Sequence, residues 1–149
     1  MKKILIIIGA IIFIVISYIL ISPLLIDITA DERIPESVLM NGTETMTLVS
    51  GTFVDADASH KVSGSAQVIK TTQGQILRFE NLEATNGPDL RIYLATDTQA
   101  TEFIDIGKNK ATIGNVNYEL PQDVDLEKYD TVLIWCRAFG VLFGSAELE

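Results

Sequence analysis

Hydrophobic residues form one long run near the N-terminus and shorter, separated runs along the rest of the chain. Within residues 4–21 nearly every position is aliphatic or aromatic, with three small or polar interruptions. A helix rises about 1.5 Å per residue, so about 20 apolar residues cross the roughly 30 Å hydrocarbon core of a membrane. The run therefore predicts a transmembrane helix that, with its flanks, covers residues 1–26 and acts as an uncleaved signal-anchor.

A cleaved signal peptide is the alternative interpretation of this run. Such peptides have an apolar core of about 7–15 residues, followed by a cleavage site with small residues. Here the apolar run is longer, and the nearest candidate site, Ile28-Thr29-Ala30, begins with a large residue. The pattern therefore favours the uncleaved anchor.

The charges on either side of the run predict its orientation. Lys2 and Lys3 precede it, whereas Asp27 and Glu32 follow it. Because positively charged flanks stay in the cytoplasm, we expect a single-pass protein of the cell membrane with a cytoplasmic N-terminus and an extracytoplasmic domain. Residues 27–46 are largely polar, and we expect them to form a spacer that lifts the domain off the membrane.

From residue 47 onward the apolar residues occur in short runs separated by turn signals, which is typical of many short strands. The strongest turn signal is Asn86-Gly87-Pro88-Asp89, since Gly permits a positive φ and Pro restricts φ to about −65°. The expected strands cover residues 47–54, 62–70, 75–82, 90–95, 102–107, 116–120, 131–139 and 141–148. About eight strands without intervening helices predict an all-β domain over residues 47–149, an antiparallel β-sandwich.

Charge narrows the classes of partner. The chain has 11 basic and 20 acidic residues, and the lysines at positions 2 and 3 are the only charges before residue 27. The part after residue 26 therefore has 9 basic against 20 acidic residues, a formal net charge of −11. Such a domain repels phosphate backbones, so we expect no nucleic-acid partner.

The only cysteine, Cys136, lies in the expected strand 131–139. Strict alternation places it on the same face as Val132, Ile134 and Ala138. An apolar face of this kind is typical of a core, where cysteine acts as a small hydrophobe. A thiol kept for redox chemistry or ligation is the other interpretation. A single cysteine excludes a disulfide within the chain but leaves open a dimer linked through Cys136.

The only histidine, His60, limits the cofactors that the chain can hold. Its simplest interpretation is a turn residue bonded to nearby Asp57. A blue-copper site needs two histidines and a cysteine, and a structural zinc site needs four nitrogen or sulfur ligands, so we expect no metal site. Covalent haem is excluded because C-x-x-C-H is absent; non-covalent haem stays open without a motif to support it, and the cofactor is unknown. The nucleophile-elbow motif of hydrolases is absent from the sequence, and we do not expect a stand-alone enzyme.

Several short blocks, in this order, resemble the DM13 domain family over residues 49–148. They are Gly51-Thr52-Phe53, His60-Lys61-Val62-Ser63-Gly64-Ser65-Ala66, Gly87-Pro88-Asp89-Leu90-Arg91-Ile92-Tyr93-Leu94, Ile134-Trp135-Cys136 and Phe143-Gly144-Ser145-Ala146. The resemblance implies an extracytoplasmic, β-rich domain proposed to act in electron transfer. By resemblance, Cys136 matches the family's candidate redox or ligating cysteine, and His60 matches a histidine that supports it.

Two functional hypotheses follow from these observations. In the first, the chain is a membrane-tethered redox or electron-transfer accessory domain that is centred on Cys136, is supported by His60 and serves a redox partner protein. In the second, it is a non-catalytic surface module that binds a protein or a small ligand, and Cys136 belongs to the core.

Overall fold

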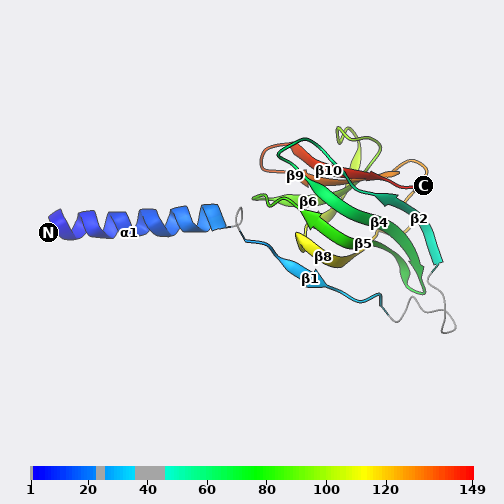
Figure 1. The fold of residues 1–149 in the computed structure, drawn as a ribbon, viewed down its shortest axis with the longest axis horizontal. Helices are drawn as coiled ribbons and strands as arrows, with labels where there is room; N and C mark the ends of the chain where they lie inside the picture. Colours follow the sequence, from blue (N-terminus) through cyan, green and yellow to red (C-terminus); the bar gives the residue numbers. More distant parts are fainter. Residues whose placement is uncertain (1, 23–25, 36–45) are drawn as a thin grey trace.

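The computed structural model describes residues 2–22, 26–35 and 46–149 and contains one helix and ten strands in those parts. The helix, α1 (Lys2–Ile21), projects away from a β-domain (Figure 1). It is long and apolar enough to cross a membrane, and none of the window Lys2–Ile19 is buried. A helix that is apolar on all sides and unburied in its own chain requires an apolar environment from elsewhere.

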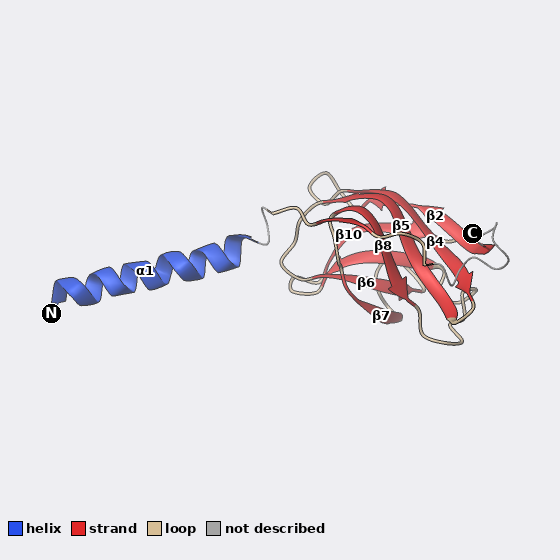
Figure 2. Ribbon diagram, turned by 90° about the horizontal axis from the view of Figure 1, so that it is seen from below, coloured by secondary structure: helices blue, strands red, loops and turns tan. Residues whose placement is uncertain are grey.

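The domain consists of two five-stranded sheets that lie face to face (Figure 2). The first sheet has the order β1-β8-β5-β4-β2 and the second β3-β10-β9-β6-β7. The strands are β1 (Thr29–Asp31), β2 (Met46–Thr52), β3 (Val54–Asp55), β4 (Val62–Thr71), β5 (Gly74–Ala84), β6 (Leu90–Ala95), β7 (Phe103–Lys108), β8 (Ile113–Glu119), β9 (Thr131–Cys136) and β10 (Val141–Glu147). Every described pairing is antiparallel except that of β1 with β8.

The predicted all-β sandwich with a preceding apolar helix is confirmed. Two of the ten strands, β1 and β3, were not expected because they have only three and two residues and therefore no visible alternation. The strand expected over residues 131–139 ends at Cys136, since the next four residues form a turn with Gly140 at φ 64°. Ala138, expected on the core face, is consequently exposed in that turn.

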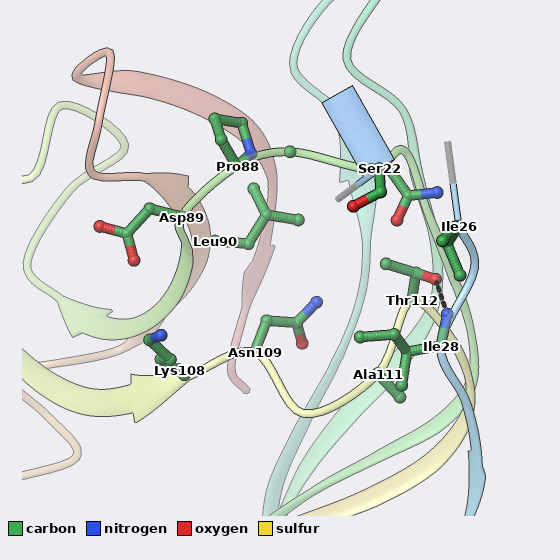
Figure 3. Close-up of a pocket in the computed structure, with 12 residues that line it drawn as sticks. Ser22, Ile26, Ile28, Pro88, Asp89, Leu90, Lys108, Asn109, Ala111 and Thr112 are labelled. Carbon is green, nitrogen blue, oxygen red and sulfur yellow. Dashed lines mark hydrogen bonds between the residues drawn. The ribbon is translucent and has the colours of Figure 1, made fainter. Parts of the chain in front are cut away.

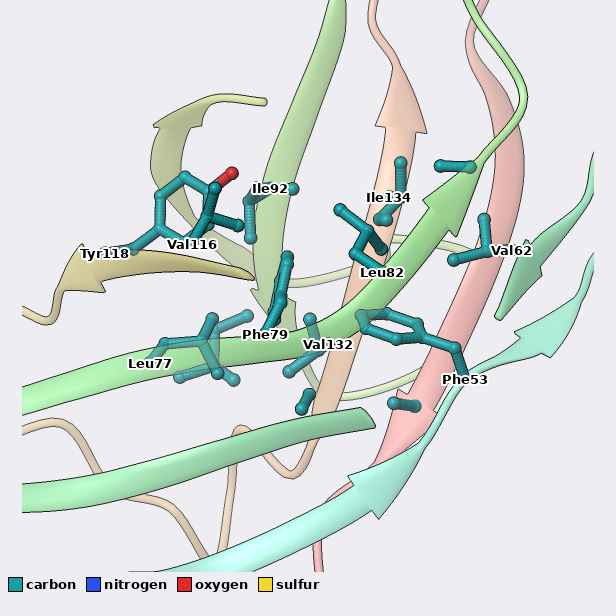
Figure 4. Packing of buried hydrophobic residues seen from close by; sticks show 14 of the residues in the cluster. Phe53, Val62, Leu77, Phe79, Leu82, Ile92, Val116, Tyr118, Val132 and Ile134 are labelled. Atoms are coloured by element: carbon teal, nitrogen blue, oxygen red, sulfur yellow. The ribbon is translucent and has the colours of Figure 1, made fainter. Parts of the chain in front are cut away.

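The core fills the space between the sheets (Figure 4). Side chains alternate between the two faces of each strand, and those on the inner face form this core. Phe79 lies at its centre, with the ring of Phe53 edge-on at 5.0 Å and that of Tyr118 at 5.3 Å between centroids. From β9, Val132 and Ile134 enter this core. The intervening side chains of β9 lie on the outer face of the second sheet, where Tyr93, Leu133 and Trp135 form a smaller cluster.

The first part of the segment expected to be a spacer, residues 27–35, is hydrogen-bonded to the domain. Ile28 donates its backbone N–H to Thr112 Oγ1 at 3.1 Å, and β1 then pairs with β8. Arg78, 6% exposed, donates from Nη1 to the carbonyl oxygen of Glu32 at 3.0 Å. Residues 36–45 of that expected spacer lie outside the described residues. Asp27 Oδ1 already accepts a hydrogen bond from Asn86 Nδ2 at 2.7 Å, so only residues 22–26 separate the end of α1 from the first hydrogen bond to the domain.

Candidate functional site

Cys136 is the last residue of β9 and lies between two strands of the second sheet. It pairs with Leu90 of β6 on one side and with Val141 of β10 on the other. The side chain is 0% exposed and belongs to the core between the sheets, and its Sγ has no hydrogen-bond partner among the described residues. A thiol buried among apolar side chains is inert towards reagents in solution. The folded structure therefore matches the core interpretation of Cys136 more closely than that of an accessible thiol.

A hydrogen-bonded turn closes the end of β9 just after Cys136. The carbonyl oxygen of Cys136 accepts N–H groups from Phe139 at 3.3 Å and from Gly140 at 2.9 Å. Arg137 holds the turn to Asp89 twice, because its backbone N–H donates to the Asp89 carbonyl at 2.9 Å and its Nε to Asp89 Oδ2 at 2.8 Å. Because the side chain of Cys136 is 0% exposed, a second molecule can reach the thiol only if the packing around this end of β9 opens.

His60 lies in the loop between β3 and β4, where it organises a turn as expected. Its Nδ1 is 2.8 Å from Asp57 Oδ2, and Asp57 Oδ1 accepts the backbone N–H groups of Ser59 at 2.7 Å and His60 at 2.8 Å. These hydrogen bonds, that of the His60 side chain first, lower the pKa of Asp57 from 3.8 to about 2. The imidazole ring also packs against Phe143, with 4.4 Å between ring centroids.

The two predicted site residues are joined by packed side chains. His60 contacts Phe143 of β10, and Phe143 in turn borders the turn before β6. A β-carbon on Gly87 would lie 3.0 Å from Phe143 Cζ and 2.8 Å from Leu90 Cδ2, so any other residue at this position would force these side chains to shift. Leu90 then pairs with Cys136. The sequence blocks around His60, Gly87, Cys136 and Phe143 thus meet at one end of the sandwich.

In the described parts of the chain, no three His, Cys, Asp or Glu side chains lie close enough together to hold a metal ion. Asp55 and Asp57, the two carboxylates before β4, accept hydrogen bonds from backbone N–H groups. Asp57 accepts hydrogen bonds within its own turn, and Asp55 Oδ1 accepts the backbone N–H of Val62 at 2.8 Å.

Sequence reasoning missed a cavity at the same end of the sandwich, beside the end of α1 (Figure 3). Its volume is about 360 Å³. The residues that matter most for its chemistry are Ile28, Pro88, Leu90, Lys108, Asn109 and Thr112. They come from three separate segments, and only the turn that contains Pro88 had a signal in the sequence. The remaining members are ordinary loop and strand residues until the fold brings them together.

Comparison with known proteins adds one finding. The family model described as "Electron transfer DM13" matches residues 52–148, which contain His60, Cys136 and the turn at Gly87. No curated protein and no solved structure matches the chain.

Proposed function

Since this chain belongs to the electron transfer DM13 family, we propose that it is an electron-transfer accessory domain tethered to the outer face of a cell membrane. The match of the family model over residues 52–148 is the observation that carries the proposal. The apolar helix and the arrangement of the family's sequence blocks at one end of the sandwich support it.

The membrane tether is supported by the surface of α1 and by the charges at its ends. The Lys2–Ile19 window is unburied and apolar, and its only charges are the two lysines at its N-terminus. The positive-inside rule then assigns a cytoplasmic N-terminus and an extracytoplasmic domain. Residues 22–26 span at most about 18 Å when extended, so the end of the sandwich near Ile28 faces the lipid head groups.

Within this proposal Cys136 is the redox or ligating group and His60 supports it from a distance. When the packing around the end of β9 opens, the Cys136 thiolate attacks a disulfide of a redox partner protein, which forms a mixed disulfide and releases the partner's second sulfur as a thiolate. His60 and Asp57 order the neighbouring loop and hold it against Phe143. The Arg137–Asp89 ion pair is 53% and 20% exposed at its two side chains, so the opening breaks a contact that solvent already screens.

A second candidate function is favoured by the 0% exposure of Cys136. In a non-catalytic binding module, Cys136 fills the core, His60 stabilises a turn, and the cavity near α1 takes a ligand. This alternative places no chemistry on the thiol.

Thiol titration of the full-length protein in detergent micelles tests the two functions, with an absorption spectrum recorded on the same sample. The redox proposal expects Cys136 to react under native conditions, or a bound chromophore to absorb. Arg137→Gln should speed the native reaction by loosening the turn, whereas Arg33→Gln, an equal change at an exposed site on the N-terminal segment, should not. A thiol that reacts only after denaturation, in a protein without a chromophore, would establish the binding module instead.

A further inference from the structure

We propose that the cavity beside the end of α1 binds the head group of a lipid-soluble quinone. The inference deepens the proposed function and rests on it, because it names the class of redox molecule that the domain meets. It concerns binding alone and assigns no chemical step to the thiol.

The position of the cavity suits a ligand that arrives from the bilayer. Ser22, which follows α1, and Ile26 line it together with the turn before β6 and the segment between β7 and β8 (Figure 3). The volume of about 360 Å³ lies within the roughly 300–1,000 Å³ of small-molecule sites. Since the short segment 22–26 keeps this end of the domain at the membrane surface, an apolar ligand reaches the cavity without crossing bulk water.

The walls of the cavity are mostly apolar. They include Ile28, Pro88, Leu90 and Ala111, and Ile28 is 55% exposed although it is a large hydrophobic residue. Small-molecule sites commonly combine such walls with a few placed polar groups. Ile26, which also lines the cavity, is 53% exposed, and exposed apolar side chains that gather at one place mark binding sites more often than a single one does.

The side chain of Asn109 lines the cavity, and a hydrogen bond from Tyr118 sets its orientation. The Tyr118 hydroxyl accepts the backbone N–H of Lys110 at 3.0 Å and donates to Asn109 Oδ1 at 3.0 Å. Burial raises the pKa of Tyr118 to about 12, so the hydroxyl keeps the proton that it donates. Because Oδ1 is the acceptor, the amide nitrogen Nδ2 forms the free end of the Asn109 side chain.

That free end points into the cavity (Figure 3). Among the described residues Asn109 Nδ2 has no hydrogen-bond partner, and the backbone N–H of Asn109 is bonded to the Leu90 carbonyl at 2.9 Å. The amide therefore offers a fixed N–H donor to an acceptor on a ligand. The Lys108 ammonium, which forms no ion pair within the described ranges, can approach the same cavity as a second donor.

The charges at the rim favour a neutral ligand over a phospholipid head group. Asp27 accepts a hydrogen bond from the cavity residue Asn86 at 2.7 Å and forms no ion pair within the described ranges, whereas the charge of Asp89 is balanced by Arg137 and Arg91. The Asp27 carboxylate repels phosphate, whereas the carbonyl oxygens of a quinone are uncharged acceptors for Asn109 and Lys108. Leu90, whose side chain lines the cavity, pairs directly with Cys136, so the ligand lies one strand pairing away from the thiol.

Calorimetric titration of the full-length protein in quinone-free micelles tests the inference, with an oxidised benzoquinone that carries one isoprenoid unit as the probe. We expect saturable binding that Asn109→Asp weakens roughly tenfold or more, since the change removes the donor while Oδ1 still accepts from Tyr118. Asn81→Asp makes the same chemical change on β5, outside the cavity, and should leave affinity unchanged. Ile28→Ala, at an exposed position, should weaken binding several-fold without affecting folding.

Three results would overturn the inference. They are the absence of saturable binding, equal weakening by the two asparagine variants, and displacement of the quinone by a phospholipid whose own binding depends on Asn109. The Cys136→Ser variant separates this inference from the proposed function. If the variant still binds quinone and the wild-type thiol is inert, the quinone site is retained and the redox role of Cys136 is rejected. If the wild-type thiol reacts but no quinone binds, the redox role is retained and the quinone site is rejected.

Discussion

The role of Cys136 in the core can be measured by comparing two substitutions, Cys136→Ala and Cys136→Ser. The side chain is 0% exposed, packs in the core that contains Val132 and Ile134, and pairs at the backbone with Leu90. Serine is closer to cysteine in size and shape, whereas alanine is closer in polarity to what the core accepts. The two replacements therefore separate a packing role from a polar or reactive one.

The structure supplies the expected magnitudes. Alanine removes one sulfur atom from a packed core, which costs about 1 kcal/mol, comparable to a buried methylene with a small cavity. Serine places a hydroxyl where no partner lies among the described residues, and an unbonded buried hydroxyl costs about 1–3 kcal/mol in addition to the lost sulfur. We expect Cys136→Ser to be less stable than Cys136→Ala, the reverse of the order in size.

Guanidinium unfolding of the full-length protein in micelles provides the measurement, followed by the fluorescence of the single tryptophan, Trp135. The midpoints and slopes give the two changes in the free energy of unfolding. A serine variant as stable as the alanine variant or the wild type would show that a polar group or water reaches position 136. The description of Cys136 as a core residue would then be wrong.

Two further predictions concern the segments around the site. Gly114→Ala should detach β1 from β8, because Gly114 has φ 111° and a β-carbon would lie within 2 Å of the Ala30 carbonyl oxygen. Hydrogen exchange at the backbone N–H of Glu32, which is bonded to the Asn115 carbonyl, should then accelerate. The control Gly74→Ala, with φ 145° and no atom within 4 Å of the added carbon, should leave that exchange unchanged. The loop at Asp57 should lose order in acid: its folded pKa of about 2 lies below the ordinary 3.8, so its stabilisation is complete above about pH 4 and is lost as the pH falls through about 2. Amide NMR shifts of Ser59 and His60 between pH 5 and pH 1.5 should follow this titration, and shifts that do not change over this range, or that titrate identically in Asp57→Asn, would contradict it.

Short-range pattern was enough to predict the helix and eight of the ten described strands. The helix follows from one long apolar run, because length and polarity alone decide whether a helix can cross a bilayer. The inward position of Cys136 follows from alternation, since successive side chains of a strand point to opposite faces. The turn role of His60 follows from Asp57 three residues earlier, a separation that a single turn closes.

The arrangement at the end of the sandwich beside α1 required the tertiary structure. β1 pairs with β8 across 84 residues of sequence, and a three-residue strand has too few positions to show a period, so no local pattern predicts it. The exposure of Ile28 depends on how its segment lies against the domain, which the local sequence does not show. The direction of the Asn109 amide is set by Tyr118, nine residues further on and in another element. Sequence alone determined the helix, most of the strands and which face of β9 is apolar. Only the packing of distant strands decided that the blocks resembling the family and a cavity share one end of the sandwich, since register and contacts between sheets are properties of the whole chain.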